Sequence, residues 1–188
     1  MATQIQIFER GSLQKGLVKK MRREGYIPCV IYVKGKSSEH GFIKKLDFDS
    51  VIRDMKPGFL PTMIFELKNE QGKTRKAIVK DIQYAVTTYD VLHLDFQELN
   101  EQDKVNVKVP IECTGVVDCV GIKAGGLLRY IMRHLKVRCH AKAIPSSFEV
   151  DVRNLDMRKV RRVSDVKMPE GVVALAHDND ILVTIVKR

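Results

Sequence analysis

Three cations in the N-terminal part of the chain have the spacing of one helix face. Lys15, Lys19 and Arg22 lie at positions i, i+4 and i+7, and Lys20 and Arg23 would widen the same face. Charges held at this spacing on a rigid rod can contact successive phosphates of a nucleic acid. The chemistry that this segment offers is therefore electrostatic binding of a polyanion.

The stretch around these cations is basic beyond the helix itself. From Arg10 to Lys36 the sequence has eight Lys or Arg against one acid, Glu24, a net charge of +7. Before Glu24 the predicted helix has no acid to pair with its cations, unlike most exposed helices. On the residues alone, a solvated helix face remains an equally good explanation.

A tyrosine follows the basic segment on a predicted strand, "IPCVIYVKG". If Ile27, Cys29 and Ile31 face one way, Val30 and Tyr32 face the other. An aromatic ring among cations suits stacking on a base or contact with a ribose. A tyrosine that packs in the core or against a hairpin fits the pattern as well.

A histidine and an aspartate in "VLHLDF" are two further polar side chains that lie close together in the sequence. His93 and Asp95 are two residues apart, so both point to the same side of a strand. On the residues alone, the favoured explanation is that these two side chains bond each other or close a turn.

The bulk composition favours a globular protein with an anionic partner. The 188 residues are 44% hydrophobic and 30% charged, with a net charge of +10 and a pI near 9.5. No run approaches the roughly 18 apolar residues that span a bilayer, and "MATQIQIFER" does not have the pattern of an export signal. The four cysteines have no C-x-x-C spacing and are expected to be buried thiols in a reducing cytoplasm.

Short alternating runs of Val, Ile and Thr predict a mainly β protein with a few short helices. One helix is expected from Ser12 as N-cap to Gly25, and another in "DFDSVIRDMK" with Asp47 or Asp49 as cap. Gly72 in "NEQGK" predicts a hairpin. The predicted strands are 3–9, 28–34, 41–46, 61–68, 73–83, 90–96, 105–113, 134–142, 147–153 and 181–187.

The polar stretch "QELNEQDK" predicts a boundary between two domains, 1–96 and 97–188. With this boundary the first domain has 17 Lys or Arg and 11 Asp or Glu, net +6, and the second has 16 and 12, net +4. Neither part contains a phosphate-binding loop, a dinucleotide-binding fingerprint or a nucleophile elbow. Cys139 and His140 are neighbours on a strand and face opposite ways, so they cannot easily bind one metal ion together. Together with the missing motifs, this leads us to expect no metal, no cofactor and no enzyme activity.

Two segments of the first domain resemble a known family. "KGLVKKMRREGYIPCVIY" and "DIQYAVTTYDVLHLDFQEL" are similar to the bacterial large-subunit ribosomal protein twenty-five family, which binds 5S ribosomal RNA. Later segments, including "VPIECTGVVDCVGIKAGGLLRYIMRHLKVRC" and "IPSSFEVDVRNL", resemble the extra domain of its longer, general stress protein (CTC) type. The resemblance covers nearly the whole chain.

The resemblance implies a six-stranded N-terminal β-barrel, similar to the anticodon-binding barrel of glutaminyl-tRNA synthetase, and a C-terminal β-rich domain. It implies a structural role in the large ribosomal subunit, in the central protuberance, where the barrel binds the loop E region of 5S rRNA. The expected partners also include 23S rRNA and neighbouring ribosomal proteins, around a cytoplasmic monomer within the ribosome. The residues expected to contact RNA are Arg10, Lys15, Lys19, Lys20, Arg22, Tyr32, Gln83, His93 and Asp95. Among them Asp95 would read bases, because a carboxylate near phosphates is repulsive unless it accepts hydrogen bonds from base amino or imino groups.

The sequence departs from the family pattern in both domains. Leu13, Val18 and Val33 stand where the family often has glycine, small or hydroxyl residues, so contacts that need such residues do not carry over to these positions. In the second domain "MRKVRRVSDV" is more basic than usual, and we hypothesise a further rRNA or protein contact there. A solvated loop is the alternative. The residues of this hypothesis are Arg158, Lys159, Arg161 and Arg162.

Two other functions stay open at this point. A stress-regulated factor would bind ribosomes substoichiometrically instead of residing in every subunit. A tRNA-binding accessory module is suggested by the shared barrel, although a fold alone does not establish a function.

Overall fold

The computed structural model describes residues 3–9, 14–32, 35, 37–100 and 103–187. The chain forms two compact units, Met1–Asp103 and Lys104–Arg188. Both are mainly β, in agreement with the predicted fold class.

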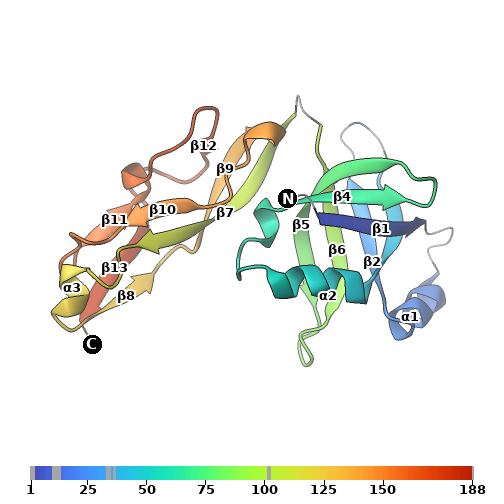
Figure 1. Ribbon diagram of the computed structural model, residues 1–188, viewed down its shortest axis with the longest axis horizontal. Helices are drawn as coiled ribbons and strands as arrows, with labels where there is room; N and C mark the ends of the chain where they lie inside the picture. The colour runs from blue at the N-terminus through green and yellow to red at the C-terminus, as the bar shows by residue number, and fades with distance from the viewer. Residues whose placement is uncertain (1–2, 10–13, 33–34, 36, 101–102, 188) are drawn as a thin grey trace. The chain divides into compact units, whose positions relative to one another are not determined.

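The first unit is a closed six-stranded barrel with the strand order β1-β3-β2-β6-β5-β4 (Figure 1). Two neighbouring pairs, β1 with β4 and β2 with β6, are parallel, and the other pairs are antiparallel. The elements are β1 (Thr3–Glu9), α1 (Lys15–Arg23), β2 (Tyr26–Tyr32), β3 (Glu39–Lys44), α2 (Lys45–Asp54), a 3-10 turn (Leu60–Thr62), β4 (Ile64–Asn69), β5 (Thr74–Tyr84) and β6 (Val91–Glu98).

Alternating apolar residues fill this barrel. In β1, for example, Ile5 and Ile7 are buried while the glutamines between and beside them are exposed. Helix α2 adds Phe48, which is fully buried and lies 6.5 Å from Phe65 between ring centroids. Phe65 in turn meets Phe96 edge-on at 5.9 Å, so helix and strands share one core.

The second unit consists of two sheets. The four-stranded sheet has the order β10-β7-β9-β12, and the three-stranded sheet has the order β11-β13-β8. The elements are β7 (Lys104–Thr114), α3 (Val120–Lys123), β8 (Gly126–Tyr130), β9 (His134–His140), a 3-10 turn (Ala141–Ala143), β10 (Phe148–Asp151), β11 (Val160–Arg162), a 3-10 turn (Val163–Asp165), β12 (Val173–Ala174) and β13 (Ile181–Lys187).

The predicted hairpin is confirmed, because β4 and β5 are antiparallel and Gly72 between them has a φ of +81°. All ten predicted strands overlap observed ones, and the ranges 3–9 and 181–187 are matched without a shift. The start of 61–68 is wrong, since Pro61 lies in the 3-10 turn before β4. Three short strands, β8, β11 and β12, were not predicted.

Both predicted helix starts are wrong. Ser12 lies outside the described residues, and α1 has Gln14 as its N-cap. Helix α2 begins two residues before Asp47, with Lys44 as N-cap, so Asp47 acts in the first turn, where its charge favours the helix dipole. The predicted end of α1 is correct: Gly25 has a φ of +82°, which terminates the helix.

The cysteines are all free, and three of them are buried as expected. Cys113 is the exception, because it lies half-buried at the end of β7. Burial raises the pKa of Cys29 to about 12, so this thiol stays protonated in the folded chain.

Candidate nucleic-acid interface

The outward face of three neighbouring strands brings together four of the predicted residues, Tyr32, Gln83, His93 and Asp95. Strand β6 lies between β2 and β5, and its His93 and Asp95 face away from the core. Tyr32 at the end of β2 is 45% exposed, while Ile31 before it is buried, so the predicted orientation of Tyr32 is confirmed. Gln83 is exposed on β5, directly opposite His93.

Asp95 is the centre of this group. The Tyr32 hydroxyl donates a hydrogen bond to Asp95 Oδ2 at 3.3 Å. His93 Nδ1 lies 2.7 Å from Asp95 Oδ1, an ion-pair distance when the imidazole is protonated, although the two atoms are not aligned as a hydrogen bond. The side chains of His93 and Asp95 are only 21% and 23% exposed. The carboxylate is therefore held in place before any partner arrives.

The pKa of the Tyr32 phenol lies above its ordinary value. Partial burial and, next, the charge and hydrogen bond of Asp95 raise the pKa of the Tyr32 phenol. The hydroxyl therefore stays a donor to the carboxylate throughout the physiological pH range.

The same face holds two residues that sequence reasoning missed. Gln97 lies opposite Tyr32, and it shares the alternation of His93 and Asp95 along β6, so the strand period could have revealed it. Asp81 lies opposite Asp95, next to a register shift in β5, and no local sequence pattern predicts that pairing. This strand face thus presents two carboxylates and two amides.

Helix α1 lies beside the start of β2 at the edge of the barrel (Figure 1). Its apolar stripe of Leu17, Val18 and Met21 is half-buried, and its cations are exposed. Arg22 Nη2 donates a hydrogen bond to the carbonyl of Leu92 at 2.8 Å, which ties the helix to the beginning of β6. The helix cations and the outward residues of β6 therefore belong to adjoining parts of one surface.

The helix cations differ in what already holds them. Lys20 lies 3.9 Å from Glu24, a weak exposed pair. Lys20, Arg22 and Arg23 also stand in the last turn, where positive charge suits the helix dipole. Lys15 is in the first turn, where the dipole disfavours a cation, and no acid stands there to offset it. Lys15 and the exposed Lys19 are therefore the two helix cations whose positive charge the fold itself explains least.

Several expectations fall on residues outside the described part of the chain. They concern Arg10, Leu13, Val33, Lys34 and Lys36. The contribution of Arg10, Lys34 and Lys36 to the basic segment, and the departures from the family pattern at Leu13 and Val33, therefore stay predictions.

The loop between β5 and β6 is fixed at its end by an ion pair with α2. Lys45 Nζ lies 2.5 Å from Asp90 Oδ1. The hydrogen bond from Lys45, with a second from Thr88, lowers the pKa of Asp90. Ala85 and Asp90 also close the loop by a backbone hydrogen bond of 2.8 Å. The contact keeps the strand ends that display Gln83 and His93 together.

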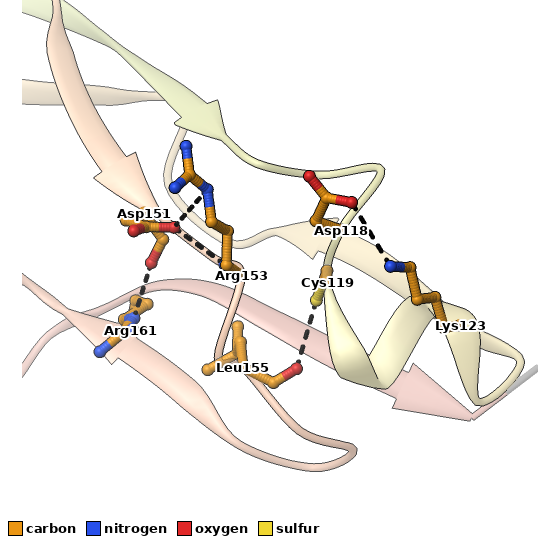
Figure 2. Close-up of polar contacts among 7 residues, drawn as sticks. All are labelled: Asp118, Cys119, Lys123, Asp151, Arg153, Leu155 and Arg161. Carbon is orange, nitrogen blue, oxygen red and sulfur yellow. Dashed lines mark hydrogen bonds and ion pairs between the residues drawn. The ribbon is translucent and has the colours of Figure 1, made fainter.

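The four predicted cations of the second unit are not equivalent. Arg161 Nε donates to the carbonyl of Asp151 at 3.1 Å (Figure 2), and Arg162 Nη1 donates to the carbonyl of Asn179. These two side chains connect β11 to other segments of the unit. Arg158, with a φ of +62°, and Lys159 lie exposed in the turn before β11. Only the latter two present charge that the fold does not use.

Figure 2 shows contacts of the segment that leads from β10 to this turn. The Cys119 thiol donates to the carbonyl of Leu155 at 3.2 Å, and Arg153 N donates to Asp151 Oδ1 at 2.9 Å. The segment between β10 and β11 is thereby joined to the start of α3.

The described residues contain no cluster of three or more His, Cys, Asp and Glu side chains arranged to hold a metal ion. Within the same residues, no helix is both long and apolar enough to cross a bilayer.

Comparison with known proteins matches both units. The model of the Ribosomal L25p family matches residues 5–96, and that of the ribosomal protein TL5 C-terminal domain matches residues 104–188. The large ribosomal subunit protein bL25 of Chlamydia abortus is 42% identical over 182 residues, covering 97% of this chain and 98% of that protein. Those of Chlamydia muridarum and Chlamydia pneumoniae are 41% and 39% identical, over 93% and 97% of this chain and 94% and 98% of theirs.

Proposed function

Because this chain belongs to the bacterial bL25 family of large-subunit ribosomal proteins, we propose that its barrel binds 5S rRNA at the loop E region, in the central protuberance. Membership makes the protein a structural constituent of the large ribosomal subunit in the cytoplasm, and not an enzyme. The choice of 5S rRNA, of loop E and of the contact residues is the proposal.

The observation that carries it is the separation of charge over one continuous surface. Helix α1 presents a row of exposed cations, whereas the strand face beside it carries Asp81 and Asp95. Carboxylates repel phosphates, so the strand face suits base edges and ribose hydroxyls, and the helix suits the backbone. An irregular internal loop offers both, because its groove exposes bases that a regular A-form duplex hides.

In this arrangement each group has its own part. Lys15, Lys19, Lys20 and Arg22 bind phosphates, with Arg10 as a further candidate. Tyr32 and His93 orient Asp95, whose carboxylate has lone pairs left to accept from a base amino or imino group. Gln83, opposite His93, supplies an amide that both donates and accepts.

The test is Asp95→Asn in the full-length protein, measured against a loop E fragment and a plain duplex of equal length. Asparagine keeps the shape but replaces an acceptor oxygen with a donor. We expect discrimination between the two RNAs to fall by on the order of 1–3 kcal/mol. An equal loss of affinity for both RNAs would contradict a reading role for Asp95.

Arg158 and Lys159 are the residues of a second proposed contact, with rRNA or a neighbouring ribosomal protein. They are exposed, whereas Arg161 and Arg162 are engaged within the unit. Reversing both exposed charges should weaken association with the large subunit and leave binding to the loop E fragment unchanged. Unchanged association would refute this contact.

Two alternative roles lead to different measurements. A stress-regulated factor predicts fewer than one copy per salt-washed large subunit. A tRNA-binding module predicts that tRNA competes with 5S rRNA for the purified protein. Full occupancy without such competition supports the structural role.

A further inference from the structure

The second unit has a higher net positive charge than the predicted domain boundary suggested. Residues 104–188 contain 16 Lys or Arg and 9 Asp or Glu, net +7, and residues 1–103 contain 17 and 14, net +3. The difference from the predicted split arises because Glu98, Glu101 and Asp103 lie within the barrel unit. The unit without a proposed 5S contact is therefore the more basic one.

Part of this charge gathers on one face of the four-stranded sheet. In β7 the residues Val105, Val107 and Val109 are buried, and in β9 Leu135, Val137 and Cys139 are buried. The side chains between them therefore line the opposite face. The exposed cations of that face are Lys104, Lys108, Lys136 and Arg138, and we call them the cationic sheet face.

The pairing of the two strands brings like charges together. Lys108 lies directly opposite Lys136, a cross-strand arrangement that destabilises a sheet. The paired segments 104–110 and 134–140 contain no Asp or Glu. The flanking acids are engaged elsewhere: Asp103 accepts from Asn100 at 3.2 Å, and Glu112 accepts from Ser147 at 3.1 Å.

One of these cations is held in position. Arg138 Nε donates to Asn106 Oδ1 at 3.1 Å, across the same register that pairs the two residues. A guanidinium fixed through Nε keeps its two terminal nitrogens in a plane suited to a phosphate. Outward residues repeat about every 6.6 Å along each strand. Because the cations lie on two paired strands, they form a small two-dimensional array instead of a single line.

We propose that the cationic sheet face is a second RNA-binding surface, which contacts the phosphate backbone of large-subunit rRNA outside the 5S site. The repulsion between Lys108 and Lys136 lowers the stability of the sheet, and no acid in the paired segments offsets it. An external polyanion that supplies the counter-charge would explain why these cations are there. Backbone contacts of this kind position the second unit and carry no sequence preference. The proposal rests on the protein's place in the large subunit, and it does not depend on the loop E contact of the barrel.

The test is Lys136→Glu in the full-length protein. The introduced carboxylate faces Lys108, so the melting temperature should stay the same or rise while binding to the large subunit weakens. The matched control is Lys167→Glu, which makes the same change in net charge at an exposed loop residue outside the paired segments 104–110 and 134–140. Both variants are bound to large subunits prepared from cells that lack the protein, across a series of salt concentrations.

We expect Lys136→Glu to dissociate at lower salt than the control and to reduce the slope of log affinity against log salt by roughly one unit. Affinity for the isolated loop E fragment should be the same for the two variants, which separates this proposal from that of the barrel. Equal behaviour of the two variants on subunits would overturn it. So would a photoreactive side chain at Lys108 that crosslinks only to a ribosomal protein, because an RNA adduct is expected.

Discussion

The hydroxyl of Tyr32 donates a hydrogen bond to Asp95 across 63 residues of sequence, at 3.3 Å. The contact exists because β2 and β6 are parallel neighbours, with Val30 beside Asp95. It connects the aromatic residue that follows the basic helix to the carboxylate proposed to read bases.

Tyr32→Phe removes the donor and keeps the ring. Because the contact is exposed, the free energy of unfolding should change by less than about 1 kcal/mol. Discrimination between the loop E fragment and a plain duplex should fall, since Asp95 loses one of the groups that orient it. Tyr84→Phe, at the exposed end of β5, is the control, and equal binding by the two variants would show that the Tyr32 hydroxyl has no such part.

Lys19→Ala should lower the salt dependence of 5S rRNA binding. One lost phosphate contact reduces the slope of log affinity against log salt by about 0.9. Affinities for the loop E fragment between low and moderate salt measure it. Lys73→Ala, in the exposed turn between β4 and β5, should leave the slope unchanged. A common slope for both variants would mean that the α1 face is only solvated.

Gly121→Ala should destabilise the second unit alone. An added Cβ would lie 2.8 Å from Ile185 Cδ1 and 2.9 Å from the carbonyl of Leu155, too close without a shift of the backbone. We expect a loss of roughly 1–3 kcal/mol in the unfolding of this unit, with the affinity for loop E preserved. Gly16→Ala, in open space on α1, should instead stabilise the barrel slightly. Loss of RNA binding in the first variant would show that the two units do not fold separately.

Cys29 should make stability fall at alkaline pH. Its pKa is raised from 9.0 to about 12 by burial, so the unfolded chain loses this proton at a lower pH than the folded one. The contribution is therefore complete below pH 9 and declines between pH 9 and 12, by up to about 1.4 kcal/mol per pH unit. Urea unfolding of the wild type and of Cys29→Ala across this range measures it. Parallel curves for the two proteins would contradict the shift.

Local periodicity was enough to predict much of this protein from its sequence. A period of two gave the buried and exposed sides of β2 and β6, and hence the outward positions of Tyr32, His93 and Asp95. A period of 3.6 gave α1 its half-buried apolar stripe and exposed cations. The end of α1 was predictable because Gly25 adopts a backbone conformation that favours glycine.

Other features depend on which strands pair, and in which register. Strands β8, β11 and β12 are short, and each lies at the edge of its sheet or next to turns, so their local signal is weak. The pairing of Asp81 with Asp95 depends on a register shift in β5, and that of Lys108 with Lys136 on the alignment of β7 with β9. Register is decided by how whole faces bury their apolar residues, so no short window of sequence contains it. The sequence determined which side chains point outward, and only the tertiary structure decided which of them meet.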